Sequence, residues 1–279
     1  MCQNVGPPQR DGVESKQRES FRRVGHRANT VRDVVDENEL ASRRRQMGIS
    51  LAWLSSAGPR PHCENGIDYW IAMSGVSSPD ANIALLQTND PGVVHHVLSV
   101  VSAMSVPTSL VLTGSALELE LGDAWRHRGD MPLMAKALSS RDLVRDPRVR
   151  AATAPDVETV SELLASAYGI EHDESDAIAA FAAVDRDNGT IWLLVDESRA
   201  VATAFSGVVG DAVCVWSLAT PERYGRRGYA SALLTDVLSR ACEAGASVGL
   251  LAATPEGEPL YRRAGWRTIE TWKIFALTH

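Results

Sequence analysis

The chain has 279 residues, 44% of them hydrophobic, which is enough for one large domain or two ordinary ones with a buried core. The net charge of −7 argues against a general nucleic-acid-binding surface. No apolar run approaches the roughly 18 residues that span a bilayer, and the N-terminus lacks the apolar stretch of a secretory signal. We therefore expect a cytoplasmic protein, monomeric or homodimeric, that binds neither nucleic acid nor membrane.

Metal binding is not expected from the cysteines and histidines. The four cysteines follow no metal-ligand or redox spacing; they are Cys2, Cys63, Cys214 and Cys242. Cys214 and Cys242 lie in apolar stretches and should be small buried residues. His95 and His96 are adjacent, and neighbouring residues of a helix point in different directions, so they cannot easily share one ion.

The first 30 residues are rich in Arg, Gln, Ser, Glu and Gly, and they contain few apolar residues. Such a segment cannot bury enough surface to offset its ordering entropy, so we expect residues 1–30 to be disordered. A helical pattern follows over residues 31–57 and ends at a Gly-Pro-Arg-Pro loop signal.

Residues 31–147 form the first predicted domain. Strands are expected at residues 67–74 and 82–87, followed by a helix capped by Asp90 and Pro91 and a strand at 109–112. A helix containing Trp125 to Gly129 should lead into a last strand at 131–138. A charged stretch over residues 141–148 separates this domain from the next.

The second predicted domain, residues 148–279, begins with a strand and two helices. Three strands joined by short turns then predict an antiparallel meander at residues 190–195, 200–208 and 212–220. A helix, a strand at 248–252, a short helix and a final strand complete the order β-α-α-β-β-β-α-β-α-β. The expected fold class is α/β (α+β), a mixed sheet flanked by helices.

The turn after the third strand of the meander has the composition of a phosphate site. It runs Gly225-Arg226-Arg227-Gly228 straight into an amphipathic helix. Unpaired N–H groups and the positive end of the helix dipole meet there, and glycine lets a ligand approach the backbone. The dinucleotide-binding and Walker-type glycine patterns are both missing from the sequence.

This turn resembles the pyrophosphate arm of the GCN5-related N-acetyltransferase (GNAT) family, Arg/Gln-x-x-Gly-x-Gly/Ala, which stands here as Gly225 to Ala230. The first position departs from the pattern, since it is Gly225, with Arg223 two residues upstream. A second motif of the family, a Tyr, three residues and a Gly before an aromatic, is matched by Tyr261, Gly265 and Trp266.

The resemblance implies a GNAT fold for residues 148–279 and an N-acetyltransferase that uses acetyl-CoA as co-substrate and no metal. The first domain repeats the element order but has Asp90 where the second has its arginines, and Asp90 would repel a pyrophosphate. We therefore expect a tandem arrangement whose N-terminal half is a degenerate GNAT-like domain. The cofactor-binding residues implied are Leu218, Ala219, Thr220, Gly225, Arg226, Arg227, Gly228, Tyr229, Ala230 and Ser231.

Tyr261 is the expected catalytic residue, the general acid that protonates the departing thiolate, although it could instead only pack beneath the cofactor. The general base stays open between Glu222, a carboxylate within residues 171–174, and water. The acceptor, a small-molecule or peptide amine, is not specified. The alternative function is a catalytically silent acyl-CoA-binding or protein-interaction module with the same fold.

Overall fold

The computed structural model describes residues 36–140, 144–184 and 188–277, all within a single unit of residues 35–279. The expected disorder of residues 1–30 lies outside this range. The α-helices are α1 (Glu37–Ser55), α2 (Pro91–Ala103), α3 (Val157–Tyr168), α4 (His172–Ala179), α5 (Tyr229–Glu243) and α6 (Glu258–Arg263). The 3-10 turns are η1 (Pro79–Ala81), η2 (Gly114–Glu118), η4 (Ala154–Asp156), η5 (Ala180–Ala183) and η6 (Glu222–Tyr224).

The described strands join in one sheet. They are β1 (His62–Asn65), β2 (Tyr69–Met73), β3 (Asn82–Leu86), β4 (Ser109–Leu112), β5 (Trp125–Ala137), β6 (Val149–Ala151), β7 (Gly189–Asp196), β8 (Arg199–Val209), β9 (Ala212–Ala219), β10 (Val248–Ala252) and β11 (Arg267–Leu277). Their order across the sheet is β1-β2-β3-β4-β11-β5-β10-β9-β8-β7-β6. The sheet is mixed, because β3 and β4, and likewise β9 and β10, run parallel.

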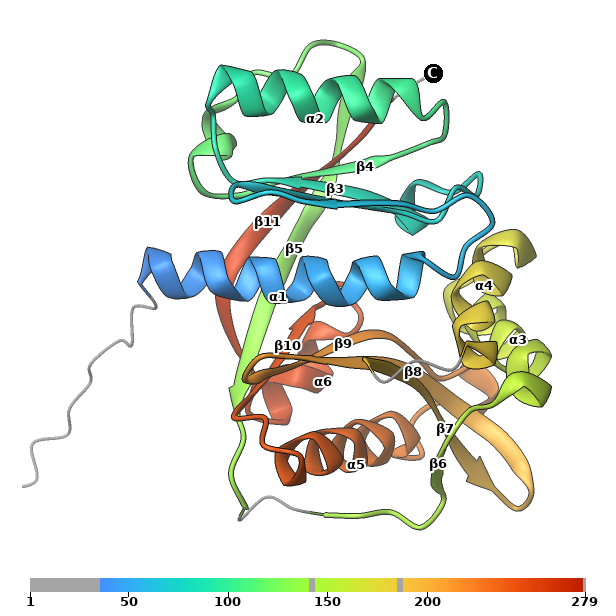
Figure 1. Ribbon diagram of the computed structural model, residues 1–279. Helices are drawn as coiled ribbons and strands as arrows, with labels where there is room; N and C mark the ends of the chain where they lie inside the picture. Colours follow the sequence, from blue (N-terminus) through green and yellow to red (C-terminus); the bar gives the residue numbers. More distant parts are fainter. Residues whose placement is uncertain (1–35, 141–143, 185–187, 278–279) are drawn as a thin grey trace, which may run out of the picture. The chain divides into compact units, whose positions relative to one another are not determined.

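The two halves of the chain, residues 36–140 and 144–277, each give their last strand to the other half. Strand β5 of the N-terminal half lies between β10 and β11, while β11 of the C-terminal half lies between β4 and β5 (Figure 1). The β5–β11 ladder runs from Arg267↔Ala135 to Leu277↔Trp125. The halves are therefore related by a repeated strand order, yet neither half completes its own part of the sheet.

The element order predicted for residues 148–279 is confirmed, and so is the antiparallel meander β7-β8-β9. The helix predicted at Trp125 to Gly129 is wrong, because these residues begin β5. Pairing with β11, some 140 residues away in the sequence, sets the conformation there, and Arg128 falls at a register shift between Gly129 and His127. In the repeated strand order, η2 takes the place that the Trp125 helix was expected to have.

Helix α1 packs between the two ends of the sheet, against β1 and β2 on one side and β8 and β9 on the other (Figure 1). Its buried positions surround the helix from Met47 to Ser55, as expected for a helix covered on both sides. At Gly48 an added Cβ would lie 2.4 Å from the Trp70 ring, so glycine permits this close approach.

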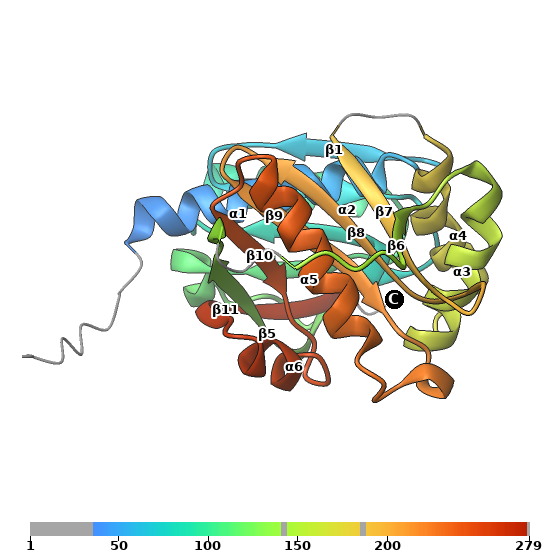
Figure 2. The ribbon, with the colours of Figure 1, turned by 90° about the horizontal axis from the view of Figure 1, so that it is seen from below.

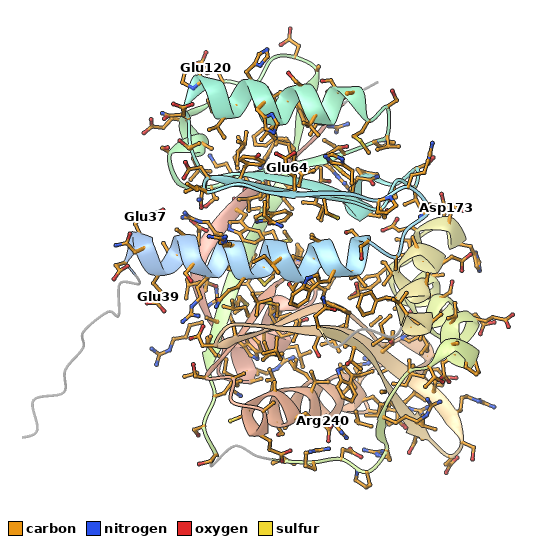
Figure 3. The ribbon with its side chains drawn as sticks, in the orientation of Figure 1. Glu37, Glu39, Glu64, Glu120, Asp173 and Arg240 are labelled. Carbon is orange, nitrogen blue, oxygen red and sulfur yellow. The ribbon has the colours of Figure 1, made fainter. Side chains whose placement is uncertain are left out.

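A buried arginine fastens the first turns of α1. Arg44 is 1% exposed, and its Nε donates to Glu270 of β11 at 2.9 Å. Its Nη1 donates to Glu37, which lies with Glu39 in the first turn of the helix (Figure 3), at 2.6 Å. A buried guanidinium that meets carboxylates from two elements fixes how α1 lies against β11.

On the outer faces of the sheet, α2 covers β2 and β3 (Figure 1), while α5 covers β7, β8 and β9 (Figure 2). Leu233, Leu234, Val237 and Leu238 are the buried face of α5, as the helical spacing predicted. Each helix lies in the crossover connection between two parallel strands: α2 in that from β3 to β4, and α5 in that from β9 to β10. Their N-termini therefore occupy equivalent places in the two halves.

Candidate active site

The predicted phosphate turn leads from the end of β9 into α5. Thr220 follows β9, η6 comes next, and Gly225 donates its N–H to Glu222 at 2.8 Å. Arg226 and Gly228 both have left-handed backbones, with φ of 58° and 80°. Gly228 is the N-cap residue of α5, and within the described residues no side chain caps this helix. The first amides of α5, from Tyr229 to Ser231, therefore remain available to an anion beside the exposed Arg226 and Arg227.

The equivalent helix start in the N-terminal half is already occupied by a carboxylate. Asp90 caps α2, and its Oδ1 accepts from the N–H groups of Gly92 at 2.9 Å and Val93 at 3.1 Å. The negative side chain satisfies the helix-terminal amides that an anionic ligand would need. The two halves thus differ at the atoms that matter for phosphate binding.

Strand β9 separates from β10 before it ends. The two strands pair only from Val248↔Ala212 to Leu251↔Val215. Beyond Val215, among the described residues, β9 pairs with β8 alone. Its register shifts between Trp216↔Phe205 and Ala219↔Thr203, which leaves a bulge at Ser217 and Leu218, and Ser217 has a φ of 53°. The β10-side edge of Trp216 to Ala219 can therefore accept an extended ligand as an added strand.

The corresponding strands of the N-terminal half stay together. Strand β3 pairs with β4 from Ile83↔Ser109 to Leu86↔Leu112, which is the end of β3. The Thr113 N–H then continues the ladder by donating to the Leu86 carbonyl at 3.0 Å. The opening found beside β9 has no counterpart there in the part of the chain that the structure describes.

Tyr261 lies on α6, is 9% exposed, and packs edge-on against Trp266 with ring centroids 6.0 Å apart. Burial raises the pKa of Tyr261 to about 12, so its hydroxyl holds its proton at neutral pH. Tyr168, at the end of α3, donates its hydroxyl to the Leu218 carbonyl at 2.8 Å. This hydrogen bond places the Tyr168 phenol beside the β9 bulge, and Tyr261 belongs to the buried cluster against which Leu218 packs. Desolvation and the nearby Tyr261 raise the pKa of Tyr168.

Several predicted residues use their side chains within the protein. The Tyr229 hydroxyl donates to Asp196 at 2.5 Å, and this bond together with Arg148 holds the pKa of Asp196 below its usual value. Arg223, two residues upstream of the first motif position, donates to Ser166 at 3.0 Å. Glu222 is exposed. Tyr229 can thus offer a ligand its backbone N–H, while its ring anchors α5 to β7.

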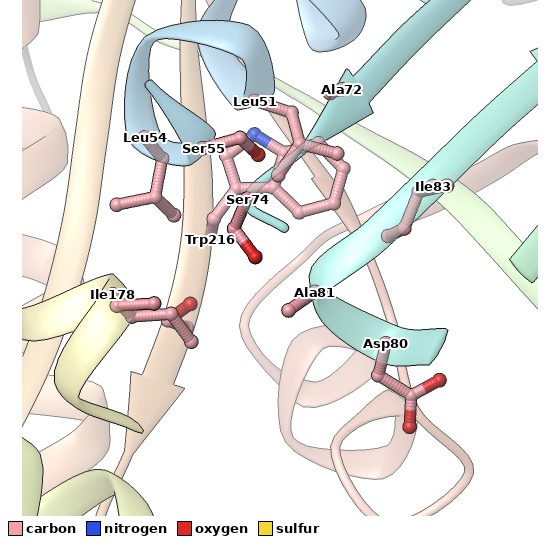
Figure 4. A pocket seen from close by; sticks show the side chains of 12 residues that line it. Leu51, Leu54, Ser55, Ala72, Ser74, Asp80, Ala81, Ile83, Ile178 and Trp216 are labelled. Carbon is pink, nitrogen blue, oxygen red and sulfur yellow. The ribbon is translucent and has the colours of Figure 1, made fainter. Parts of the chain in front are cut away.

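A pocket of about 80 Å³ opens beside the β9 bulge, between the two halves (Figure 4). Trp216 and Ser217 of β9 meet α1, the β2–β3 region and Ile178 of α4 around it. Ser74 is 4% exposed, and its Oγ has no hydrogen-bond partner within the described residues. Ser74 was not predicted as a site residue, because its distance from β9 in the sequence gives no local signal.

The acidic run before and within α4 divides between solvent and the protein interior. Glu171, Asp173 and Asp176 are exposed, as a solvated face would be. Glu174 is only 7% exposed, and burial raises the pKa of its carboxyl group. Ser78 hydrogen-bonds this carboxyl, which faces Asp80, Asp173 and Arg128. Among the carboxylates considered as a general base, which are Glu222 and those within residues 171–174, Glu174 alone is buried.

Across residues 36–140, 144–184 and 188–277, no three His, Cys, Asp or Glu side chains gather where they could hold a metal ion. In the same ranges, none of the helices combines the length and apolar character needed to span a membrane.

Comparison with known proteins shows the fold and a matching domain family. The acetyltransferase (GNAT) domain family matches residues 148–269. A GCN5-related N-acetyltransferase from Kribbella flavida superposes with a TM-score of 0.58 at 19% identity, covering 86% of this chain and 95% of that protein. A GCN5-related N-acetyltransferase-like protein from Streptococcus suis superposes with a TM-score of 0.51 at 14% identity, covering 87% of this chain and all of the other. No curated protein sequence matches this chain.

The fold is therefore that of the GNAT acetyltransferases, since similarity at these identities shows the fold alone. Residues 148–269 match the sequence model of the GNAT acetyltransferase domain as well. This match supports acyl transfer as the general class of activity.

Proposed function

We propose that this protein transfers an acetyl or another acyl group from a coenzyme A thioester to an amine, with both substrates bound together. The observation that carries the proposal is the pairing of an uncapped α5 N-terminus with the unpaired edge of β9. The amides of residues 229–231 would bind the pyrophosphate, with Gly225 to Gly228 forming the turn around it. Leu218, Ala219 and Thr220 would meet the pantetheine arm along the strand edge.

Acceleration would come mainly from positioning, because a thioester already reacts with a free amine. Tyr261 would donate its proton to the thiolate as the carbon–sulfur bond breaks. Its buried, protonated hydroxyl suits this role, since Tyr261 belongs to the cluster against which Leu218 of the β9 bulge packs. The N-terminal half would contribute walls of the acceptor site and bind no cofactor of its own.

Tyr261→Phe tests this assignment. The substitution keeps the ring packed on Trp266 but removes the hydroxyl, so we expect an unchanged melting temperature and a fall in kcat of about 10²-fold or more. Thiol release from acetyl-CoA with a panel of amines measures it. Tyr69→Phe, which removes a hydroxyl from β2, is the matched control and should keep full activity.

Equal rates for wild type and Tyr261→Phe would remove Tyr261 from the mechanism. If acetyl-CoA binds but no amine is acylated above background, the silent-module function replaces the proposed one.

A further inference from the structure

The pocket between α1, η1, α4 and the β9 bulge is too small for a drug-sized ligand. Its volume of about 80 Å³ is roughly half that of a 150 Å³ cavity that holds one benzene. The lining is mostly apolar, including Leu51, Ile83, Ile178 and Trp216. A short aliphatic group would bind here favourably, because its own apolar surface and that of the pocket would both be removed from water.

Ser74 and Asp80 are polar side chains of the N-terminal half that line the pocket. Figure 4 shows the Ser74 hydroxyl near Trp216, while Asp80 lies beyond Ala81. An unpartnered hydroxyl that is 4% exposed is costly to bury, so a ligand that supplies its hydrogen bond would be favoured. Asp80 also pairs with Arg128, whose Nη1 lies 2.7 Å from Oδ1.

Glu174 lies close to Asp80, although its own side chain is not among those that line the pocket. It lies three and four residues before Ala177 and Ile178, which line the pocket, so all three share one face of α4. Asp80, Asp173 and Arg128 are the charged groups that face Glu174, and Ser78 hydrogen-bonds it. Two acids and one arginine besides Glu174 leave the region net negative, which attracts a cation.

We propose that this pocket binds the acceptor of the reaction, a small primary ammonium ion that carries a short aliphatic chain, and that Glu174 takes the proton from its nitrogen. This inference rests on the proposed acyl transfer. The pocket reaches Ser217 of the bulge, next to Leu218, where the thioester would lie. The N-terminal half thus selects the acceptor for a reaction carried out on the C-terminal half.

The ammonium gives one proton to Glu174 and becomes a neutral amine. The nitrogen then bonds to the thioester carbonyl carbon, the carbon–sulfur bond breaks with its electron pair on sulfur, and Tyr261 protonates the thiolate. The second nitrogen proton returns to the Tyr261 phenolate, and Glu174 releases its proton to water.

The experiment measures thiol release from acetyl-CoA by the full-length chain with methylamine, propylamine, butylamine, hexylamine and a tripeptide with a free N-terminus. Each added methylene that the pocket buries should raise kcat/KM about fourfold until the pocket is full. We expect the optimum at propylamine or butylamine. Ile178→Ala should move the optimum to a longer chain, while Ile67→Ala, at a position 85% exposed, should leave it unchanged.

Two variants test the polar groups proposed to bind and deprotonate the amine. Ser74→Ala removes no internal hydrogen bond, so it should leave stability unchanged and raise the KM of the amine three- to tenfold. Glu174→Gln should lower kcat/KM by about 10²-fold and abolish its acidic limb. That limb should lie above the ordinary glutamate pKa in wild type, since burial raises the pKa of Glu174 and activity falls as pH drops through it. Glu162→Gln, on the exposed side of α3, is the control.

A preference for the tripeptide over every alkyl amine, a chain-length optimum that Ile178→Ala does not move, or an unchanged acidic limb in Glu174→Gln would overturn this inference. Turnover without acetyl-CoA dependence, or no binding of acetyl-CoA at all, would instead refute the acyl transfer itself.

Discussion

Two threonines have buried side-chain hydroxyls, but only one of the hydroxyls has a hydrogen-bond partner within the described residues. The Thr203 Oγ1 donates to the Trp192 carbonyl at 3.0 Å. The Thr220 Oγ1 is also buried but has no partner within the described residues, and it stands at the end of β9 where the pantetheine arm is proposed to lie. A buried hydroxyl left without a partner costs stability, which is acceptable where a ligand supplies the missing bond.

We expect Thr220→Val to leave the melting temperature unchanged or raise it, because no internal hydrogen bond is lost, and to weaken acetyl-CoA binding about three- to tenfold. Thr203→Val should instead destabilise the fold by about 1–2 kcal/mol without a specific effect on binding. Thermal melts and calorimetric titration of both variants measure this. A loss of stability in Thr220→Val equal to that in Thr203→Val would show that Thr220 has a structural partner.

Helix α1 is held by contacts to both ends of the sheet. One of these contacts brings the Gly48 backbone against the Trp70 ring. Alanine normally favours a helix over glycine by about 1 kcal/mol. Here the added Cβ would lie 2.4 Å from the buried Trp70 ring, so we expect Gly48→Ala to lower the free energy of unfolding by about 1–3 kcal/mol. Gly122→Ala is the control, since its Cβ meets nothing within 4 Å. A stabilised Gly48→Ala variant in denaturant titrations would contradict the packing described for α1.

The β8–β9 turn is tied to α1 by a pH-sensitive contact. Arg43 donates to Asp211 at 2.7 Å and Gln46 donates at 2.8 Å, and these bonds lower the pKa of Asp211 to about 2. Because the folded value lies below the unfolded one of about 3.9, the contact stabilises the fold above pH 4 and is lost as the pH falls towards 2.

Asp211→Asn should therefore lower the melting temperature at pH 7, and this difference from wild type should shrink towards pH 2. Since Asp211 is half-exposed, the effect should not exceed about 1 kcal/mol. Melting curves between pH 2 and 7 measure it, and a difference that stays constant with pH would show that the Asp211 carboxylate charge is not involved.

At the scale of the whole molecule, the exchange of β5 and β11 makes each half incomplete. A fragment of residues 144–279 would lack β5, which pairs with both β10 and β11. We expect this fragment not to fold alone but to regain structure when co-expressed with residues 31–143. Circular dichroism and co-purification measure this. A fragment that melts cooperatively and binds acetyl-CoA by itself would contradict the shared sheet as the basis of stability.

The sequence predicted the elements whose conformation depends on neighbouring residues, and it missed those whose conformation depends on strand pairing with distant residues. The turn from Gly225 to Gly228, the face of α5 and the meander β7-β8-β9 all depend on neighbours within a few residues, and those elements lie where they were predicted. The strand at Trp125 and the exchange with β11 depend on partners about 140 residues away. Ser74 and Ile178 line one pocket only because the halves pack together, so no spacing in the sequence joins them.

The tandem domain boundaries at residues 30 and 147 stay a prediction, although the repeated strand order of the two halves agrees with a duplicated origin. The contrast between Asp90, which caps α2, and Gly228, which leaves α5 open, explains why only one half is proposed to bind acyl-CoA. A single acyl-CoA site per chain is expected from that contrast.

Calorimetric titration of acetyl-CoA into wild type, Gly228→Asp and Asp90→Gly tests it most directly. A carboxylate at residue 228 would lie beside the first amides of α5. The left-handed backbone there, with φ of 80°, strains a side chain, but aspartate is among the residues that tolerate it best, and an added Cβ meets nothing within 4 Å. We predict one site per chain in wild type, affinity reduced at least tenfold in Gly228→Asp, and unchanged binding in Asp90→Gly. Undiminished affinity in Gly228→Asp, or no binding by wild type, would contradict the account.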